Sequence, residues 1–337
     1  TIKDVPGYAT LVQKNTLESL DDYITDAGIN LADFNGITDQ VTVDGSLYEL
    51  PFRSDYWLIY YNKDVFDAAG IAYPSNDMTM EDYDALARQL TDTTYGSQVY
   101  GCHYHTWRSA VELFGILDGK HSILDGNYDW MIPYYDMILS EEDDGVCQTY
   151  TDLSTEGLHY SAAFSNGNVA MMNMGSWFIS TLISNLDSGE YDSSLCGNWG
   201  IASYPHPDGA EAGSTIATIT GLAVTSASAN KDAAFDFVNW VSGTEGAKVM
   251  ASTGNFPAIM TDDVINTIAG MAGFPTDEGS KEALNITNAY LEVPYAENVS
   301  EINSILDTYH TSIMNREVTV EEGVASMNEQ VGKILNQ

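Results

Sequence analysis

Basic residues are scarce in this chain. Its 337 residues include 12 Lys and Arg against 49 Asp and Glu, which gives a formal net charge of -37. A negative charge of this size repels phosphate backbones and anionic membrane surfaces. We therefore expect no nucleic-acid partner.

Long apolar stretches are also missing. No run of about 18 apolar residues occurs, so we do not expect the chain to span a membrane. The sequence does not begin with the basic stretch and apolar segment of a signal peptide. An export signal, if the natural precursor has one, is therefore expected upstream of this sequence.

Cysteine is rare and irregularly spaced. Cys102, Cys147 and Cys196 form no C-x-x-C pair, which excludes a disulfide scaffold. We expect three small buried thiols. One disulfide bridge stays open as an alternative if the protein is exported.

Common enzyme motifs are absent. The sequence has no P-loop, G-x-G-x-x-G turn, H-E-x-x-H helix, G-x-S-x-G elbow or EF-hand loop. The stretch "CHYH" offers Cys102, His103 and His105 as metal ligands, but no fourth ligand is evident. We therefore predict no metal site and no cofactor. The acidic run "EEDD" (141–144) is interpreted as a solvated face.

Short apolar runs alternate with amphipathic stretches, which indicates an α/β fold. The chain is also longer than a single core usually grows, so two lobes are expected. "WLIYY" (57–61) and "GLAVT" (221–225) are predicted to be buried strands. No flexible linker separates two independent domains, so we expect short, structured connections between the lobes.

Three helices have recognisable starts. The stretches 79–90 and 319–335 open with capping boxes, Thr79 with Asp82 and Thr319 with Glu322. "NKDAAFDFVNWVSG" (230–243) has Asn230 as its predicted N-cap. Its predicted buried face consists of Ala234, Phe237, Val238 and Val241.

Aromatic residues are plentiful, with 6 Trp and 21 Tyr. Such rings stack on the apolar faces of sugars while carboxylates accept hydrogen bonds from hydroxyl groups. In "NGNVAMMNMGSWFIS" (166–180), a strand stops at Gly175 and Ser176, and Trp177 begins a helix. This position lies at the rim of an α/β crevice, where ligands bind. Trp130, Trp199 and Trp240 are instead expected to pack in the core.

Five stretches resemble the bacterial extracellular solute-binding proteins of sugar ABC importers, the family that includes maltose-binding protein. They occur in the order that the family shows, along almost the whole chain. They are "LESLDDYI" (17–24), "GSLYELPFRSDYWLIYYNKDVFDAAGI" (45–71), "FSNGNVAMMNMGSWFIS" (164–180), "GLAVTSASANKDAAFDFVNWVSGTEGAK" (221–248) and "GNFPAI" (254–259).

The resemblance implies a two-lobe periplasmic-binding-protein-like fold of type II, with the ligand cleft between lobes joined by crossing strands. The N-terminal lobe would comprise residues 1–55 and 219–265, and the C-terminal lobe 56–218 and 266–337. The crossing strands are expected at 52–57 and 217–222. Relative to the family, the N-terminal lobe is expected to lack its first strand, helix and strand.

The resemblance also implies ligand-binding residues. Asp55 would accept hydrogen bonds from sugar hydroxyls, Trp57 would lie on the same strand face, and Arg53 would orient Asp55. Tyr104 and Trp107 match cleft aromatics, and Trp177 matches the stacking platform of the second lobe. The other candidates are Ser176, Thr220, Gly221, Tyr295 and Asp4.

The implied function is capture of a carbohydrate, expected to be an oligosaccharide, by hinge closure and its delivery to the permease subunits of an ABC importer. We expect a monomer, either a cell-surface lipoprotein of a Gram-positive bacterium or a periplasmic protein. The alternative is a secreted glycosidase that uses a carboxylate pair across a cleft. A scaffold or adhesin, and a polyamine or peptide ligand, also stay open at this stage.

Overall fold

The computed structural model describes residues 1–93 and 98–336. Its strands are β1 (Leu50–Asn62), β2 (Tyr100–His103), β3 (Val169–Gly175), β4 (Trp199–Ser203), β5 (Thr215–Leu222) and β6 (Ala289–Leu291). Its α-helices are α1 (Val5–Gln13), α2 (Asp21–Ala27), α3 (Lys63–Ala69), α4 (Met80–Thr93), α5 (Ser109–Ile116), α6 (Ile132–Asp143), α7 (Tyr150–Glu156), α8 (Tyr160–Ser165), α9 (Trp177–Ser188), α10 (Ser193–Cys196), α11 (Lys231–Ser242), α12 (Thr244–Ala251), α13 (Asp262–Ala269), α14 (Glu278–Glu282), α15 (Val299–Met314) and α16 (Val320–Leu335). Three short 3₁₀ helices are η1 (Leu31–Phe34), η2 (Asp39–Val41) and η3 (Asp129–Met131).

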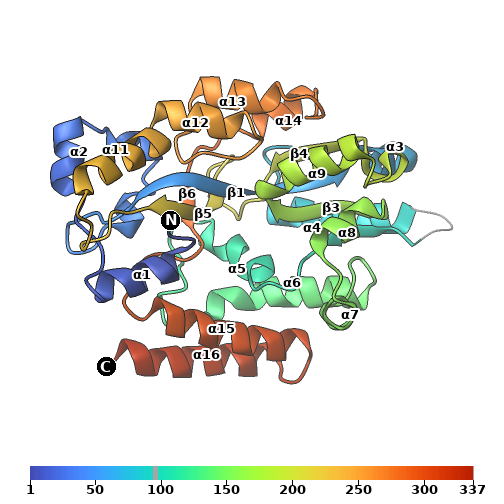
Figure 1. Cartoon of the computed structure of the whole chain (residues 1–337). Helices are drawn as coiled ribbons and strands as arrows, with labels where there is room; N and C mark the ends of the chain where they lie inside the picture. The colour runs from blue at the N-terminus through green and yellow to red at the C-terminus, as the bar shows by residue number, and fades with distance from the viewer. Residues whose placement is uncertain (94–97, 337) are drawn as a thin grey trace.

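The sheet has six strands in the order β2-β3-β1-β5-β6, with β4 also paired to β1. The long strand β1 runs across the middle of the molecule (Figure 1). From Leu50 to Tyr56 it pairs with β5, and from Trp57 onward it pairs with β3 and β4 instead. β1 therefore joins two halves of the structure, and its change of partner falls between Tyr56 and Trp57.

The predicted strand at 57–61 is confirmed as part of β1. Leu58, Ile59 and Tyr60 are each at most 1% exposed, and a strand buried on both faces is typically a continuous apolar run. The strand predicted at 221–225 is only partly right, because β5 ends at Leu222. β5 runs antiparallel to β1, and β6 runs parallel to β5 on the side away from β1. Three segments therefore lie side by side at this crossing.

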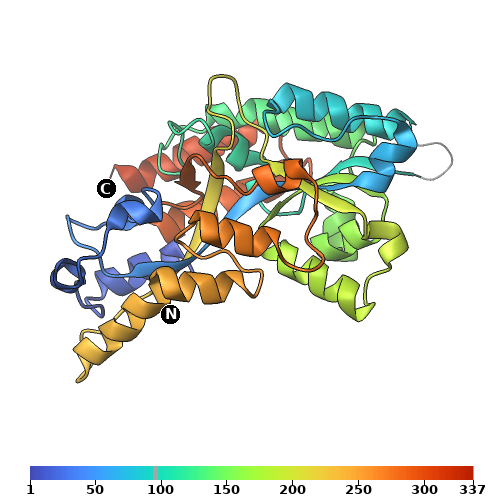
Figure 2. The ribbon, with the colours of Figure 1, turned by 90° about the horizontal axis from the view of Figure 1, so that it is seen from above.

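Helices cover both faces of the sheet. Helices α11, α12 and α13 lie on one side, whereas α5, α6, α15 and α16 lie on the other (Figures 1 and 2). Both predicted capping boxes form: Asp82 N–H donates to Thr79 Oγ1 at 3.1 Å, and Glu322 N–H to Thr319 Oγ1 at 3.2 Å. Within the described residues, no helix is both long and apolar enough to cross a membrane.

Three predictions about burial need correction. The buried face of α11 consists of Phe235, Val238 and Ser242, whereas Phe237 is 60% exposed. Trp240 lies on the same open side of this helix and is 54% exposed, so it is not a core residue. The helix is rotated relative to the prediction because apolar residues occur on both of its faces, so periodicity alone did not identify the buried one.

The acidic run at 141–144 is not uniformly solvated. Glu141 and Glu142 are buried against the lobe, and only Asp143 and Asp144 face solvent. The run lies at the end of α6, where successive residues point to different sides of the helix. The prediction that all three cysteines are buried is confirmed.

Candidate functional site

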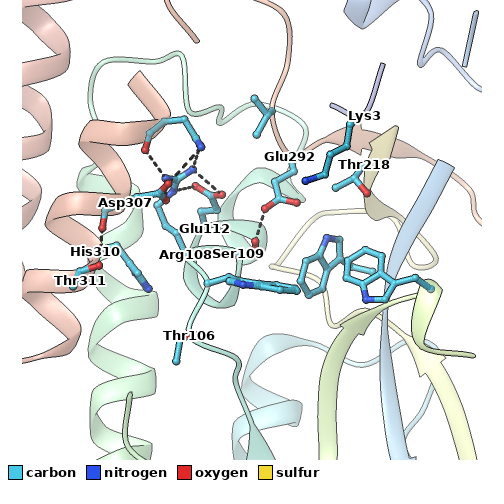
Figure 3. Close-up of a pocket in the computed structure, with 15 residues that line it drawn as sticks. Lys3, Thr106, Arg108, Ser109, Glu112, Thr218, Glu292, Asp307, His310 and Thr311 are labelled. Carbon is cyan, nitrogen blue, oxygen red and sulfur yellow. Dashed lines mark hydrogen bonds and ion pairs between the residues drawn. The ribbon is translucent and has the colours of Figure 1, made fainter. Parts of the chain in front are cut away.

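A cavity of about 550 Å³ lies beside the crossing of β1, β5 and β6 (Figure 3). Several segments contribute to its wall. They are the first residues of the chain, the middle of β1, β5, the segment after β2 together with α5, the start of α9, the segment after β6, and α15. The lining residues are Lys3, Trp57, Thr106, Trp107, Arg108, Ser109, Glu112, Trp177, Thr218, Glu292, Val293, Asn303, Asp307, His310 and Thr311.

One wall of the cavity, which we call the aromatic wall, consists of Trp57, Trp107 and Trp177. The Trp57 ring stands edge-on to both others, with centroid distances of 6.4 Å to Trp107 and 5.5 Å to Trp177. The Trp177 indole N–H donates to the Tyr160 hydroxyl at 3.1 Å. The three rings come from β1, the segment after β2 and the start of α9, so the fold gathers them from separate parts of the sequence.

The Trp57 indole N–H is a buried polar group. It makes no hydrogen bond of good geometry with the described residues, although it lies near enough to the Glu292 carboxylate to lower the pKa of that group. A buried donor without a partner costs about 1–3 kcal/mol. A ligand acceptor or an ordered water in the cavity would satisfy it.

The opposite wall, which we call the charged wall, is centred on Arg108. Arg108 Nε lies 2.5 Å from Glu112 Oε2, and its Nη2 donates to the Asn303 side chain at 2.5 Å and to the other Glu112 oxygen at 3.3 Å. A further ion pair joins Arg108 to Asp307 (Figure 3). Arg108 and Glu112 are buried. The contacts from Arg108 to Asn303 and Asp307 tie α5 to α15 inside the protein.

Glu292 lies just after β6 and is part of the charged wall. The Ser109 hydroxyl donates a hydrogen bond to its carboxylate, and Glu292 and Lys3 point toward the same space (Figure 3). Burial and the negative charge of Glu112 raise the pKa of Glu292 to about 7, although Ser109 and Arg108 oppose the shift. The carboxyl group therefore changes charge near neutral pH.

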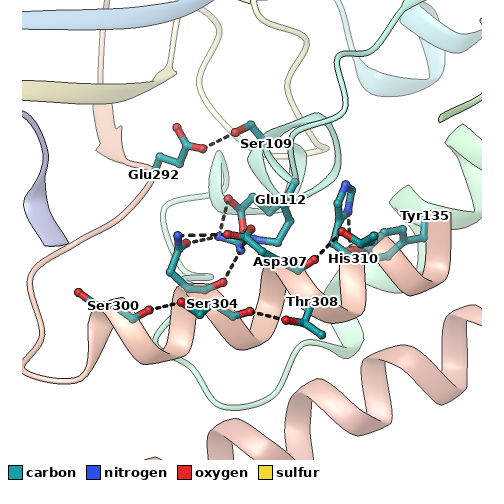
Figure 4. A network of polar contacts seen from close by, with 12 residues as sticks. Ser109, Glu112, Tyr135, Glu292, Ser300, Ser304, Asp307, Thr308 and His310 are labelled. Carbon is teal, nitrogen blue, oxygen red and sulfur yellow. Dashed lines mark hydrogen bonds and ion pairs between the residues drawn. The ribbon is translucent and has the colours of Figure 1, made fainter. Parts of the chain in front are cut away.

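His310 closes the charged wall from α15. Its Nδ1 lies 3.0 Å from the Tyr135 hydroxyl (Figure 4). Burial and the positive charge of Arg108 lower the pKa of His310 to about 3. The imidazole is therefore neutral at physiological pH and acts as a hydrogen-bonding group.

Of the predicted site residues, the structure places Trp57, Trp107 and Trp177 on the cavity wall. Arg53, Asp55 and Ser176 lie together nearby, and the predicted contact between Arg53 and Asp55 is present. Arg53 Nε lies 2.7 Å from Asp55 Oδ2, and Ser176 donates to Asp55 Oδ1 at 3.0 Å. Asp55 is 7% exposed and does not line the cavity. Burial raises its pKa, against the opposing charge of Arg53.

Tyr104 and Tyr295 also lie away from the cavity lining. Tyr104 is 5% exposed and packs edge-on against Phe114 in the core. Tyr295 packs edge-on against Tyr8, with ring centroids 5.8 Å apart. Both rings are therefore packing contacts in this structure.

Asp4, Thr220 and Gly221 lie together in space, because the first residues of the chain pair with the end of β5. Asp4 caps α1 by accepting a hydrogen bond from the Gly7 N–H at 2.8 Å. Thr220 donates to the Lys3 carbonyl at 3.4 Å. A Cβ atom on Gly221 would come within 2.1 Å of a Glu49 carboxylate oxygen, so a larger residue there would displace the Glu49 side chain.

Sequence reasoning missed the charged wall. Arg108, Ser109 and Glu112 lie within five residues after the aromatic residue Trp107, and Glu292 is three residues before Tyr295. The i, i+4 spacing of Arg108 and Glu112 was an available signal for an ion pair on one helix face. Nothing local in the sequence indicated that Asp307 and His310, two hundred residues further on, would join them.

The histidines of "CHYH" do not form a metal cluster with their neighbouring cysteine. In the part of the chain that the structure describes, the one close group of three candidate metal ligands is Cys102, Glu141 and Cys147. His103 and His105 do not belong to it. Burial is the main cause that lowers the pKa of His103 to about 3 and that of His105 to about 4.

Two halves joined by crossing strands, with a polar and aromatic cavity beside the crossing, define a ligand-binding protein of the two-lobe type. The family model for bacterial extracellular solute-binding proteins matches residues 1–248, and the chain belongs to this family. The family consists of binding proteins, so the alternative of a secreted glycosidase is not supported.

Solved structures share the fold. A sugar transporter of Rhizobium etli in an open conformation is 47% identical, with a TM-score of 0.93, and the match covers 98% of this chain and 84% of that chain. A substrate-binding protein of Listeria monocytogenes in complex with cycloalternan is 21% identical, with a TM-score of 0.79, covering 100% and 84%. A maltose-bound protein of T. maritima is 17% identical, with a TM-score of 0.73, covering 97% and 82%. A comparison with curated protein sequences gives no match.

Proposed function

We propose that this solute-binding protein captures an oligosaccharide in the cavity beside the strand crossing and delivers it to the membrane permease of an ABC importer. The observation that carries the proposal is the pairing of an aromatic wall with a charged wall across one cavity. Sugar rings have apolar faces that stack on indoles and hydroxyl groups that hydrogen-bond to carboxylates. The Rhizobium etli relative, which is described as a sugar transporter, supports the same ligand class.

The size of the cavity supports a small oligosaccharide. Its volume of about 550 Å³ falls within the range of about 300–1,000 Å³ that is usual for small-molecule sites. Trp57, Trp107 and Trp177 would contact the ring faces. Glu292 and Ser109 would contact the hydroxyl groups, and the free Trp57 N–H would donate to a ring or hydroxyl oxygen.

Delivery requires a change of shape, because a transporter must distinguish loaded protein from empty protein. We propose that the lobes rotate about the β1, β5 and β6 crossing and close on the ligand. A ligand that moves this equilibrium from 1:99 to 99:1 must bind the closed form better by about 5.5 kcal/mol. Both walls belong to residues 56–218 and 266–337, so this difference would come from contacts that a ligand held there makes with the N-terminal lobe on closure, beginning with Lys3 on the cavity lining.

The location and assembly of the protein are proposed as well. The family is extracellular, and we propose a monomer held at the surface of a Gram-positive cell by a lipid anchor, or else free in a periplasm. Light scattering of the purified chain tests the monomer. Extraction of the native precursor into detergent, with mass measurement of its N-terminal peptide, tests the anchor.

The central test is calorimetry with a panel of oligosaccharides, followed by small-angle scattering with the tightest-binding one. We expect saturable binding, a change in Trp fluorescence and a smaller radius of gyration in the bound form. Reducing sugar should not accumulate. No binding across the panel, together with saturable binding of a polyamine or peptide, would refute the carbohydrate assignment. Identical scattering profiles at saturation would refute hinge closure.

A further inference from the structure

Two of the three cysteines lie on paired backbone segments in the core. Cys102 is in β2, and Cys147 follows α6. The Gly101 N–H donates to the Val146 carbonyl at 2.9 Å, and the Cys102 N–H approaches the same oxygen at 3.4 Å. These two contacts hold the segment that carries Cys102 directly against the segment that carries Cys147.

The side chains are also close. The two Sγ atoms and a carboxylate oxygen of Glu141 all lie within 4.8 Å of one another. Cys102 is 0% exposed and Cys147 is 2% exposed, and their neighbour Glu141 is buried as well. Both Glu141 carboxylate oxygens lack a hydrogen bond of good geometry from the described residues. The two sulfur atoms thus lie close together in the buried interior.

We propose that Cys102 and Cys147 form a disulfide bond in the exported protein. The family is extracellular, and disulfides form and persist in oxidising compartments. A disulfide replaces two buried S–H groups with an apolar bridge. Cys196 lies apart in α10, where its Sγ contacts the Asp192 carbonyl oxygen at 3.7 Å, and it stays a free thiol.

A metal ion is the other occupant that this cluster could suggest. A structural zinc site typically uses four ligands, whereas this cluster offers three ligand atoms among the described residues, from Cys102, Glu141 and Cys147. A covalent bridge needs only the two sulfur atoms, and for this reason we favour it.

The bond forms by exchange with an oxidised thiol partner, such as the disulfide of glutathione or of an exported thiol oxidase. One cysteine thiolate attacks that disulfide to give a mixed disulfide and releases one thiol of the partner. The second cysteine thiolate then displaces the remaining partner sulfur. Two electrons and two protons pass to the oxidant, which leaves as two thiols. Because both sulfurs are buried in the folded protein, exchange occurs before this lobe has finished packing.

The bridge has a structural consequence for the cavity. Strand β2 leads directly into the segment that carries Trp107 and Arg108, and the bond would anchor the start of this segment to the end of α6. In the chain-entropy account, a crosslink that closes a long loop stabilises a protein mainly by restricting its unfolded state. We therefore expect reduction to lower the melting temperature, by on the order of 5–10 °C.

The test counts free thiols by mass. The full chain is refolded in a buffer of reduced and oxidised glutathione, denatured in guanidinium with N-ethylmaleimide, and weighed before and after reduction. We expect one alkylated cysteine before reduction and three after it, with a linked peptide pair containing Cys102 and Cys147. The Cys196→Ser variant serves as the control and should give none before reduction and two after it.

Three alkylated cysteines before reduction in the refolded chain would overturn the proposal. So would a linked pair that includes Cys196. Elemental analysis of the same sample distinguishes the alternatives, because one equivalent of zinc with three free thiols would assign the cluster to a metal instead. The thiol count does not depend on sugar binding, so its outcome stands apart from that of the proposed function.

Discussion

The two walls of the cavity are built in different ways. Two rings of the aromatic wall are each placed by a short local feature: Trp57 by the centre of a strand, and Trp177 by the junction of β3 and α9. The charged wall depends on residues far apart in the sequence, because Arg108 in one segment binds Asn303 and Asp307 in another. A ring can be lost without leaving a charge behind. The loss of one member of the charged wall leaves its partner buried and uncompensated.

The largest effect should come from breaking the centre of the charged wall. In Arg108→Met, Glu112 stays buried without its partner, and removing one member of a buried pair typically costs about 3–5 kcal/mol. We expect the free energy of unfolding, measured by denaturant titration, to fall by this amount. Arg88→Met is the matched control, because Arg88 pairs with Asp84 and Asp144 near the surface, where such pairs contribute about 0–1 kcal/mol. Equal losses in the two variants would show that the Arg108 pair does not hold the wall together.

A second comparison concerns two carboxylates, Glu292 on the cavity and Asp55 behind it. Glu292→Gln should weaken sugar binding by about 1.5–3 kcal/mol, the range for a hydrogen bond to a charged group. Asp55→Asn removes an acceptor from Arg53 and Ser176, so we expect its cost to fall more on stability than on affinity. Calorimetry measures the sugar affinity of both variants, and denaturant titration measures their free energy of unfolding. If Asp55→Asn weakens binding more than Glu292→Gln does, Asp55 is the carboxylate that holds the ligand, as the family resemblance implies.

For the aromatic wall, we expect mutation to affect ligand affinity more than the free energy of unfolding, the reverse of Arg108→Met. Trp177→Ala should weaken sugar binding by about 1–3 kcal/mol, because it removes a large aromatic contact at the ligand. Its effect on the free energy of unfolding should be smaller than that of Arg108→Met. Trp240→Ala is the control, since this exposed indole lies on α11 and does not line the cavity. A change within twofold for Trp177→Ala would show that the ring only packs against its neighbours.

The position of Trp177 could be predicted from a local sequence pattern, whereas the long-range contacts of the charged wall could not. A strand that stops at Gly175 and Ser176 before a Trp is a local pattern, and the structure forms it at those residues. Tyr104 and Trp107 are three residues apart, yet one is in the core and the other faces the cavity. Their separation depends on how the loop after β2 turns, which periodicity does not encode. Likewise, Glu141 and Asp143 are both acidic residues at nearly the same position in the sequence, but only the surrounding lobe determines which of them is buried.

The smallest effect should be a dependence of sugar binding on pH. The pKa of Glu292 is raised to about 7, so the group is mostly protonated at pH 6 and mostly ionised at pH 8. An ionised carboxylate accepts stronger hydrogen bonds from sugar hydroxyls than a protonated one. We therefore expect affinity to rise as the pH increases through 7, by no more than about tenfold per pH unit, or about 1.4 kcal/mol. In Glu292→Gln, which cannot ionise, calorimetry at pH 6, 7 and 8 should give a flat profile. A wild-type profile that is equally flat would mean that the ligand does not contact the Glu292 carboxylate. A rising profile that persists in the variant would assign the titration to another group facing the cavity.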